Sequence, residues 1–127
     1  MPASDDLRAL ARQRKLAHRQ FLDLGSGTYA AFLEMERAAY RDGALPRSAK
    51  ELIAVGVSVV LDCRSCMQWH IGQAAAAGAT LRQVLEAVEV GMEMGGGPAT
   101  VSARFALEAM AEAFGPEAMA AEAGRPA

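Results

Sequence analysis

The chain has 127 residues, the length of one domain with a single hydrophobic core. Hydrophobic residues make up 52% of it and charged residues 22%, which is ordinary for a soluble globular protein. Because the formal net charge is −2, there is no surplus of cations to neutralise phosphates, and nucleic acid is excluded as the expected partner. The longest apolar run, residues 52–61, is about half of what a membrane crossing needs, so no membrane association is expected.

The first twenty residues and the cysteine content bear on the cellular compartment in which the protein is expected. The first twenty residues are acidic, then basic and amphipathic, without the apolar centre of a signal peptide. We therefore expect a cytoplasmic protein. In that reducing environment, two cysteines are not expected to form a permanent structural staple.

The elements predicted along the chain are all helical, because Ala, Leu, Met, Glu and Arg are abundant and turn signals arrive at helical intervals. The prediction is one all-α domain over 1–127, a bundle of about six helices with its core in 28–114 and a frayed tail over 115–127. The predicted helices cover about 4–24, 28–41, 48–61, the cysteine segment up to Gly78, Thr80 to the glycines at 95–97, and 99–114.

Capping residues support three of these helix starts. Ser4, followed by two aspartates, is a predicted N-cap of the first helix. Ser48 with Glu51 forms a capping-box pattern at the third helix, and Thr80 with Gln83 repeats that pattern at the fifth.

One segment also fits a strand. Residues 52–60, LIAVGVSVV, are rich in β-branched side chains, and a strand followed by C-x-x-C and a helix is the thioredoxin arrangement. After Gln73, however, only helical patterns follow, and no strands are available to complete a sheet. We therefore predict a helix over 48–61 that is apolar around most of its circumference, buried in the core or in a subunit interface. Apolar faces left over in so short a chain indicate oligomerisation through them.

Both cysteines and one of the two histidines lie within LDCRSCMQWH, residues 61–70. Cys63, Cys66 and His70 are spaced i, i+3 and i+7, so one helix face would carry all three. A helix N-terminus favours thiolate over thiol, Arg64 adds a cation, and imidazole can transfer a proton at neutral pH. This pattern indicates a redox-active cysteine pair with His70 as its acid–base partner.

Other interpretations use the same residues. The cysteines also fit simple apolar packing, because cysteine is often a small buried residue. Chance alone would rarely place two of them so close together on one helix face with a histidine. A structural zinc ion needs four ligands, and C-x2-C-x3-H supplies three, which leaves Asp62, Glu51 or the distant His18 as the fourth. Haem attachment is excluded, because its histidine would follow the second cysteine directly. Redox use of the pair is the interpretation that these residues favour.

Glu51, Cys63, Cys66 and His70 together form the pattern E-x11-C-x2-C-x3-H. This pattern resembles the alkyl hydroperoxidase D (AhpD) branch of the carboxymuconolactone decarboxylase-like family. The segment KELIAVGVSVVLDCRSCMQWHIGQAAAAGAT is similar to the core segment of that family, and looser similarity covers about 32–90. The resemblance implies an all-α fold that assembles into homohexamers, with homotrimers as the alternative.

The resemblance also implies roles for individual residues. Cys63 and Cys66 would alternate between dithiol and disulfide, while His70 and Glu51 would form a proton relay, with a water molecule in its path. The implied activity is that of an alkyl hydroperoxide reductase, or of a disulfide reductase for a peroxidase partner, with no bound cofactor or metal. Its partner would be a lipoyl-type or thioredoxin-like dithiol donor, or a peroxiredoxin. Ser65 stands where some members carry a histidine, so no help from a second imidazole is expected.

Glu51 has a competing structural role as the partner of Ser48 in the capping box. Geometry adds a difficulty, because Glu51 would lie ~15 Å from the loop after its helix and His70 only ~9 Å into the next helix, at 1.5 Å per residue. A simple antiparallel hairpin would then pair them poorly. We therefore expect either a steep crossing or an earlier end of the third helix.

Two other functions stay open from the sequence. The first is a non-redox enzyme of the wider family, a decarboxylase or hydrolase-like activity that uses His70 and Glu51. The second is a sensor based on a metal or on the thiols. Around the site, Met67 and Trp69 are expected to pack in the core or an interface in preference to lining a pocket, and His18 is expected at the solvated surface.

Overall fold

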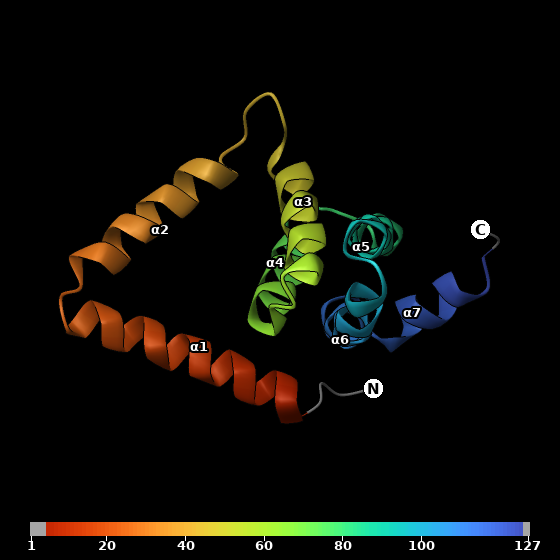
Figure 1. The fold of residues 1–127 in the computed structure, drawn as a ribbon, viewed down its shortest axis with the longest axis horizontal. Coiled ribbons are helices and arrows are strands. Elements are labelled where there is room, and N and C mark those ends of the chain that lie inside the picture. The colour runs from red at the N-terminus through yellow and green to blue at the C-terminus, as the bar shows by residue number, and fades with distance from the viewer. Residues whose placement is uncertain (1–4, 126–127) are drawn as a thin grey trace.

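The protein is described here by a computed structural model of residues 5–125, in which every regular element is a helix (Figure 1). The predicted N-cap Ser4 and residues 126–127 of the predicted tail lie outside this range. Within it, no helix is both long and apolar enough to cross a membrane. In chain order the helices are α1 (Asp5–Asp23), α2 (Gly27–Tyr40), α3 (Arg47–Val60), α4 (Arg64–Ala76), α5 (Leu81–Gly95), α6 (Gly97–Phe114) and α7 (Pro116–Ala123).

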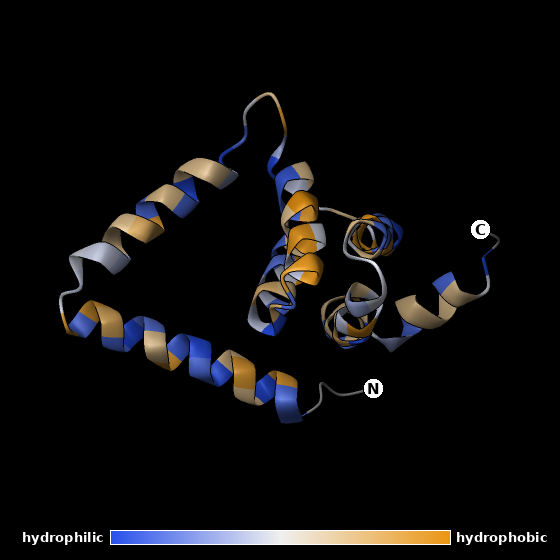
Figure 2. Ribbon diagram, in the orientation of Figure 1, coloured by the Kyte–Doolittle hydropathy of each residue, from blue (hydrophilic) through white to orange (hydrophobic). Residues whose placement is uncertain are grey.

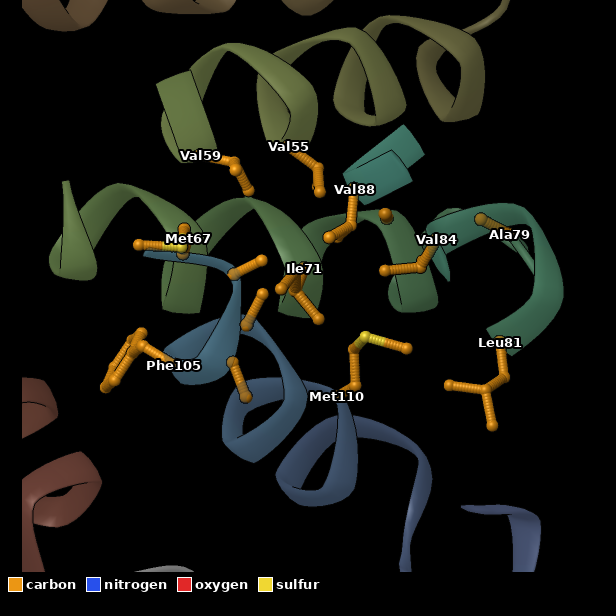
Figure 3. Packing of buried hydrophobic residues seen from close by; sticks show 14 of the residues in the cluster. Val55, Val59, Met67, Ile71, Ala79, Leu81, Val84, Val88, Phe105 and Met110 are labelled. Carbon is orange, nitrogen blue, oxygen red and sulfur yellow. The ribbon is translucent and has the colours of Figure 1, made fainter. Parts of the chain in front are cut away.

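Helices α3 to α6 enclose the core. Helix α3 packs against α4 and α5, and α6 packs against both α4 and α5. Their buried apolar side chains recur at helical spacing, as in Val55 and Val59 of α3 or Met67 and Ile71 of α4, and they converge between the helices (Figure 3). This packing places the C-terminal end of α3 beside the start of α4, where the cysteines lie.

The helical prediction for the β-branched segment is confirmed by which of its side chains are buried. Val55 and Val59 are fully buried, whereas Ile53, Val57 and Val60 are about half exposed. Burial at i and i+4 is the period of a helix, and a strand would bury every second residue. Apolar residues nevertheless lie on both the buried and the exposed sides of α3, as predicted, and Figure 2 shows mostly apolar colours on the side in view after the first turn.

Helices α1 and α2 form an open arm beside this body. In Figure 1 they make two sides of a triangle whose third side is the α3–α4 pair. The arm is held by stacking of Phe21 on Tyr29, whose ring centroids lie 4.7 Å apart, and by the N-cap Ser26, which accepts a hydrogen bond from the backbone N–H of Tyr29. At the other end of α1, Leu7 is buried in the core.

The predicted frayed tail is wrong for most of its length, because α7 is a packed helix. Gly115 has a φ of 90°, which turns the chain out of α6, and Pro116 follows at the first helical position, which its fixed φ favours. Met119 then packs against the core, and Arg82 of α5 donates a hydrogen bond of 2.7 Å to Glu122. The described residues therefore hold seven helices instead of about six.

Of the two predicted capping boxes, one is present and one is absent. Thr80 and Gln83 form the complete box at the start of α5. Helix α3 instead uses Pro46 as its N-cap, without a side-chain hydrogen bond, so the box predicted for Ser48 and Glu51 is wrong. The reason is that the helix begins before Ser48, which leaves the side chain of Glu51 one turn inside α3 and directed to the interior.

Helices α3 and α5 approach so closely that glycines are required at their contact. A Cβ atom on Gly91 would lie 2.6 Å from the backbone oxygen of Gly56. We expect Gly91→Ala to force the helices apart and to lower the free energy of unfolding by about 1–3 kcal/mol. Gly72→Ala is the matched control, since its Cβ would meet nothing within 4 Å and alanine improves helix propensity by up to about 1 kcal/mol. Urea unfolding measures both, and equal effects of the two substitutions would contradict this close contact.

Candidate active site

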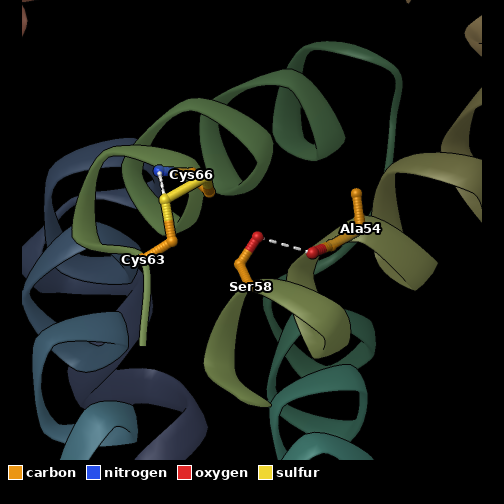
Figure 4. Close-up of a disulfide and its surroundings, with 4 residues drawn as sticks. All are labelled: Ala54, Ser58, Cys63 and Cys66. Carbon is orange, nitrogen blue, oxygen red and sulfur yellow. Dashed lines mark hydrogen bonds between the residues drawn. A yellow bond between two sulfur atoms is a disulfide. The ribbon is translucent and has the colours of Figure 1, made fainter. Parts of the chain in front are cut away.

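The cysteine pair lies at the N-terminus of α4. Cys63 is the N-cap, and its Sγ accepts a hydrogen bond of 3.2 Å from the backbone N–H of Cys66 (Figure 4). The two sulfurs form a disulfide across Cα atoms 5.2 Å apart. The Cys63 sulfur is thus held where the unpaired N–H groups of the helix stabilise negative charge.

The turn before Cys63 depends on Asp62. Its φ of 53° is in the left-handed region, which aspartate tolerates better than most residues. The carboxylate of Asp62 accepts a hydrogen bond of 2.8 Å from the hydroxyl of Ser102 on α6, and the backbone N–H of Cys63 donates to the carbonyl of Ser58 at 3.1 Å. These contacts fix the entry of the chain into α4.

Glu51 and His70 are brought together. The Nδ1 atom of His70 lies 2.7 Å from Oε1 of Glu51, and the Glu51 residue is only 1% exposed. Nε of Arg47 approaches the other carboxylate oxygen at 3.4 Å. A buried carboxylate needs such partners, since burial without them would cost several kcal/mol. A carboxylate can only accept, so this contact is a hydrogen bond when Nδ1 carries a proton, and Nε2 is then the ring nitrogen that is free to exchange one.

The expected difficulty in pairing Glu51 with His70 does not arise. Glu51 lies nine residues before Val60, the last residue of α3, and His70 lies six residues after Arg64, the first residue of α4. The offset of three residues is ~4.5 Å along the helix axes. The two side chains cover this offset, so the hairpin of α3 and α4 pairs them without an early end of α3.

Two residues that the sequence pattern did not single out surround this pair. The ring of Tyr40 lies 5.2 Å from the imidazole of His70, centroid to centroid. Burial, and then the charges of Glu51 and Glu36, raise the pKa of Tyr40 above its ordinary value, so its hydroxyl stays neutral. Arg47 bonds both to Glu51 and, through its terminal nitrogen, to Gln73 of α4. Its position four residues before Glu51 is the one sequence signal that could have indicated it.

A cavity of about 740 Å³ opens between α1, α2 and α4. Cys66, Trp69 and His70 line it, whereas Cys63 does not. Trp69 was expected to pack in the core or an interface, but it lines this cavity, while Met67 is buried in the core. His18 is exposed, as predicted, but it too lines the cavity, with its Nδ1 2.6 Å from the hydroxyl of Tyr29.

Other residues considered from the sequence are engaged elsewhere. The guanidinium of Arg64 stacks on Phe105 of α6, 5.2 Å from the ring centroid. Of the possible fourth zinc ligands, Asp62 is bonded to Ser102 and Glu51 to His70. In the range from 5 to 125, no three His, Cys, Asp or Glu residues are grouped to hold a metal ion.

Comparison with known proteins identifies the fold. The sequence profile of the carboxymuconolactone decarboxylase family matches residues 27–109. An uncharacterised protein of Cupriavidus necator is 42% identical over 71% of this chain and 82% of its own length. The chain belongs to the carboxymuconolactone decarboxylase family.

Solved structures of this family have the same fold. The apo form of a family protein from Legionella pneumophila superposes with a TM-score of 0.82 at 31% identity, over 88% of this chain and 99% of that one. A family protein from Thermotoga maritima gives a TM-score of 0.63 at 28% identity, over 67% of this chain and 88% of that one. A part in antioxidative response has been suggested for the Thermotoga protein.

The neutral state of Tyr40 predicts a pH dependence of stability. Because the pKa of Tyr40 is raised by folding, its contribution is fully present below the ordinary pKa of about 10 and is lost as the pH rises through the folded value. We expect the wild type to lose more stability between pH 8 and pH 10.5 than Tyr40→Phe does. Urea unfolding at the two pH values measures this, and parallel losses in the two proteins would contradict it.

Proposed function

We propose that this protein is a thiol–disulfide oxidoreductase of the AhpD type that reduces organic hydroperoxides, with Cys63 and Cys66 as its redox pair. The observation that carries the proposal is that Cys66 and His70 line one cavity, while Glu51 holds His70 from behind. A sulfur that can be oxidised, a base and an opening for substrate thus occur at one place. The antioxidative role suggested for the Thermotoga relative agrees with this chemistry.

In the proposed cycle Cys66 attacks first, because its side chain is the one that lines the cavity. His70 takes the thiol proton on Nε2, and the thiolate attacks the terminal oxygen of the hydroperoxide. The O–O bond breaks, the alkoxide receives a proton and leaves as the alcohol, and Cys66 becomes a sulfenic acid. Cys63 then attacks that sulfur and releases water, which forms the disulfide.

The position of Cys63 suits the second step. Its sulfur accepts the backbone N–H of Cys66, so a thiolate there is stabilised by the first turn of α4. Two electrons from an external dithiol, of lipoyl or thioredoxin-like type, return the disulfide to two thiols. We place this cycle in the cytoplasm, whose reducing conditions favour regeneration of the dithiol. In the related proposal of a disulfide reductase, the same dithiol would reduce a peroxiredoxin partner.

The His70–Glu51 pair also supports a second candidate, since the family to which the chain belongs is named for a decarboxylase. An imidazole backed by a buried carboxylate can move a proton without help from the cysteines. Alkylation of both thiols separates the two functions. It would stop a disulfide cycle, and it would leave unchanged an activity that depends on His70 and Glu51 alone.

Single cysteine variants test the redox cycle and its order. We expect both Cys63→Ser and Cys66→Ser to lose dithiol-dependent turnover of tert-butyl hydroperoxide. Cys63→Ser should still react once and accumulate a sulfenic acid on Cys66, which dimedone traps and mass spectrometry detects. Cys66→Ser should show no such adduct. Circular dichroism serves as the control for folding, and full turnover by both variants would exclude the mechanism.

The proposal includes self-assembly through a groove between α3 and α5. This α3–α5 groove has a volume of about 690 Å³, and apolar side chains such as Val57, Val90 and Met94, which are 50%, 62% and 73% exposed, line it. An exposed apolar patch of this kind is typical of a protein–protein interface. We propose that copies of the chain associate through this groove and form a homohexamer or a homotrimer.

A charge in the α3–α5 groove should weaken the assembly. We expect the wild type to sediment with a mass of several chains, and Val57→Glu to shift that mass towards one chain, since a buried unpaired carboxylate is costly. Val101→Glu is the matched control, because Val101 is 54% exposed on α6 and does not line the groove. A wild type that sediments as a single chain would contradict the assembly.

A further inference from the structure

The cavity beside Cys66 has a charge opposite to that of the whole chain. Arg14, Lys15 and Arg19 of α1 line it, against the single carboxylate of Glu36 on α2. The chain as a whole carries a net charge of −2, so this excess of cations does not follow from the composition. A hollow lined by one sign of charge concentrates ligands of the other sign.

The other walls of the cavity are apolar. Leu22 of α1 and Phe32 of α2 line it and are 47% and 50% exposed, and Leu33 and Trp69 complete an apolar surface beside the cations. Large apolar side chains that stay uncovered next to reactive groups indicate a site for an apolar ligand. The lining of α1 extends from Arg14 to Leu22, which is ~12 Å along the helix, so the site suits an elongated molecule.

The cationic side of the cavity is held in place. Arg14 lies over the ring of Trp69, 4.8 Å from the ring centroid, and donates to the side-chain oxygen of Gln68 at 3.5 Å. Gln68 is buried, and its amide nitrogen donates to the backbone oxygen of Leu7 at 2.9 Å and to Glu112 at 3.1 Å. The buried bond to Leu7 and the part-buried bond from Arg14 therefore tie α1, which carries all three cations, to α4, which carries Cys66 and His70.

From this arrangement we infer that the preferred substrates are amphipathic hydroperoxides with a long apolar chain and a carboxylate, the class of fatty-acid hydroperoxides. The chain lies along the apolar wall, the carboxylate pairs with the cations of α1, and the peroxide group within the chain reaches Cys66. The inference rests on the proposed function for its catalytic part, since reduction follows the steps given above. Binding of the apolar chain and the carboxylate stands on the cavity alone.

Trp69 makes binding measurable without any chemistry, because it is the only tryptophan of the chain and lines the cavity. We expect laurate, below its micellar concentration, to change the fluorescence of Trp69 saturably and to bind more tightly than 1-dodecanol. Lys15→Gln/Arg19→Gln should raise the dissociation constant of laurate about tenfold and remove its advantage over dodecanol. Arg14 is kept, because its contact with Trp69 would disturb the signal.

The matched control removes two other cations from the same helix. Arg8→Gln/Arg12→Gln makes the same change of charge on α1, at positions that do not line the cavity, and should leave the preference for laurate intact. Equal binding of laurate and dodecanol by the wild type would overturn the inference. So would a laurate preference that persists in Lys15→Gln/Arg19→Gln.

Turnover separates this inference from the proposed function. With a dihydrolipoyl donor, we expect a higher kcat/KM for an octadecadienoic acid hydroperoxide than for its methyl ester, and loss of that ratio in Lys15→Gln/Arg19→Gln. If the wild type reduced no hydroperoxide, tert-butyl hydroperoxide included, the proposed function would fail, and so would the assignment of peroxide substrates. A wild type that reduced tert-butyl hydroperoxide without preferring acid over ester would overturn the inference alone.

Discussion

The structure depends most on one buried charge, the carboxylate of Glu51. With 1% of the residue exposed, it is stable only because His70 binds one oxygen and Arg47 approaches the other. Those contacts join α3 to α4 in one register, since a shift by a residue would separate the carboxylate from the imidazole. The same pair orients His70, whose ring Tyr40 covers on one side and which lines the cavity on another. A constraint on stability and a requirement of acid–base chemistry are thus met by the same hydrogen bond.

The hairpin of α3 and α4 also assigns different environments to the two cysteines. Asp62 turns the chain in a left-handed conformation that Ser102 stabilises, and this makes Cys63 the N-cap of α4. Its sulfur faces the backbone N–H of Cys66, while Cys66 itself lines the cavity. These environments suit the proposed cycle, in which substrate would approach Cys66 from the cavity and the N-terminus of α4 would stabilise negative charge on Cys63.

Local signals predicted the helices well and the long-range contacts poorly. The lack of further strands after Gln73 was enough to assign α3 as a helix, and the structure agrees, since only Val55 and Val59 of its β-branched residues face the core. The role of Glu51 was harder to predict, since a capping box with Ser48 accounts for the same sequence pattern. Only the structure shows that Pro46 is the N-cap of α3 and that no such box forms. Tyr40 comes from α2, outside the spaced motif, and only the tertiary fold brings it to His70. The tail was mistaken for disorder because its stabilising contacts, such as Arg82 with Glu122, join distant parts of the chain.

In the proposed reaction, the charges that line the cavity and the charge of Glu51 behind it would act on the same substrate. A substrate carboxylate close to a thiolate at Cys66 and to the buried Glu51 would be repelled by both charges. Within the α3–α4 pair, Arg47 offsets the charge of Glu51, and His70 stabilises that carboxylate by a hydrogen bond. Proton transfer to His70 would give the thiolate a cationic neighbour, and the cations of α1 across the cavity add the positive charge that a substrate carboxylate needs. The arm of α1 and α2 has few contacts to the body and many exposed apolar side chains, and in this proposal it is the part of the fold that supplies the substrate site.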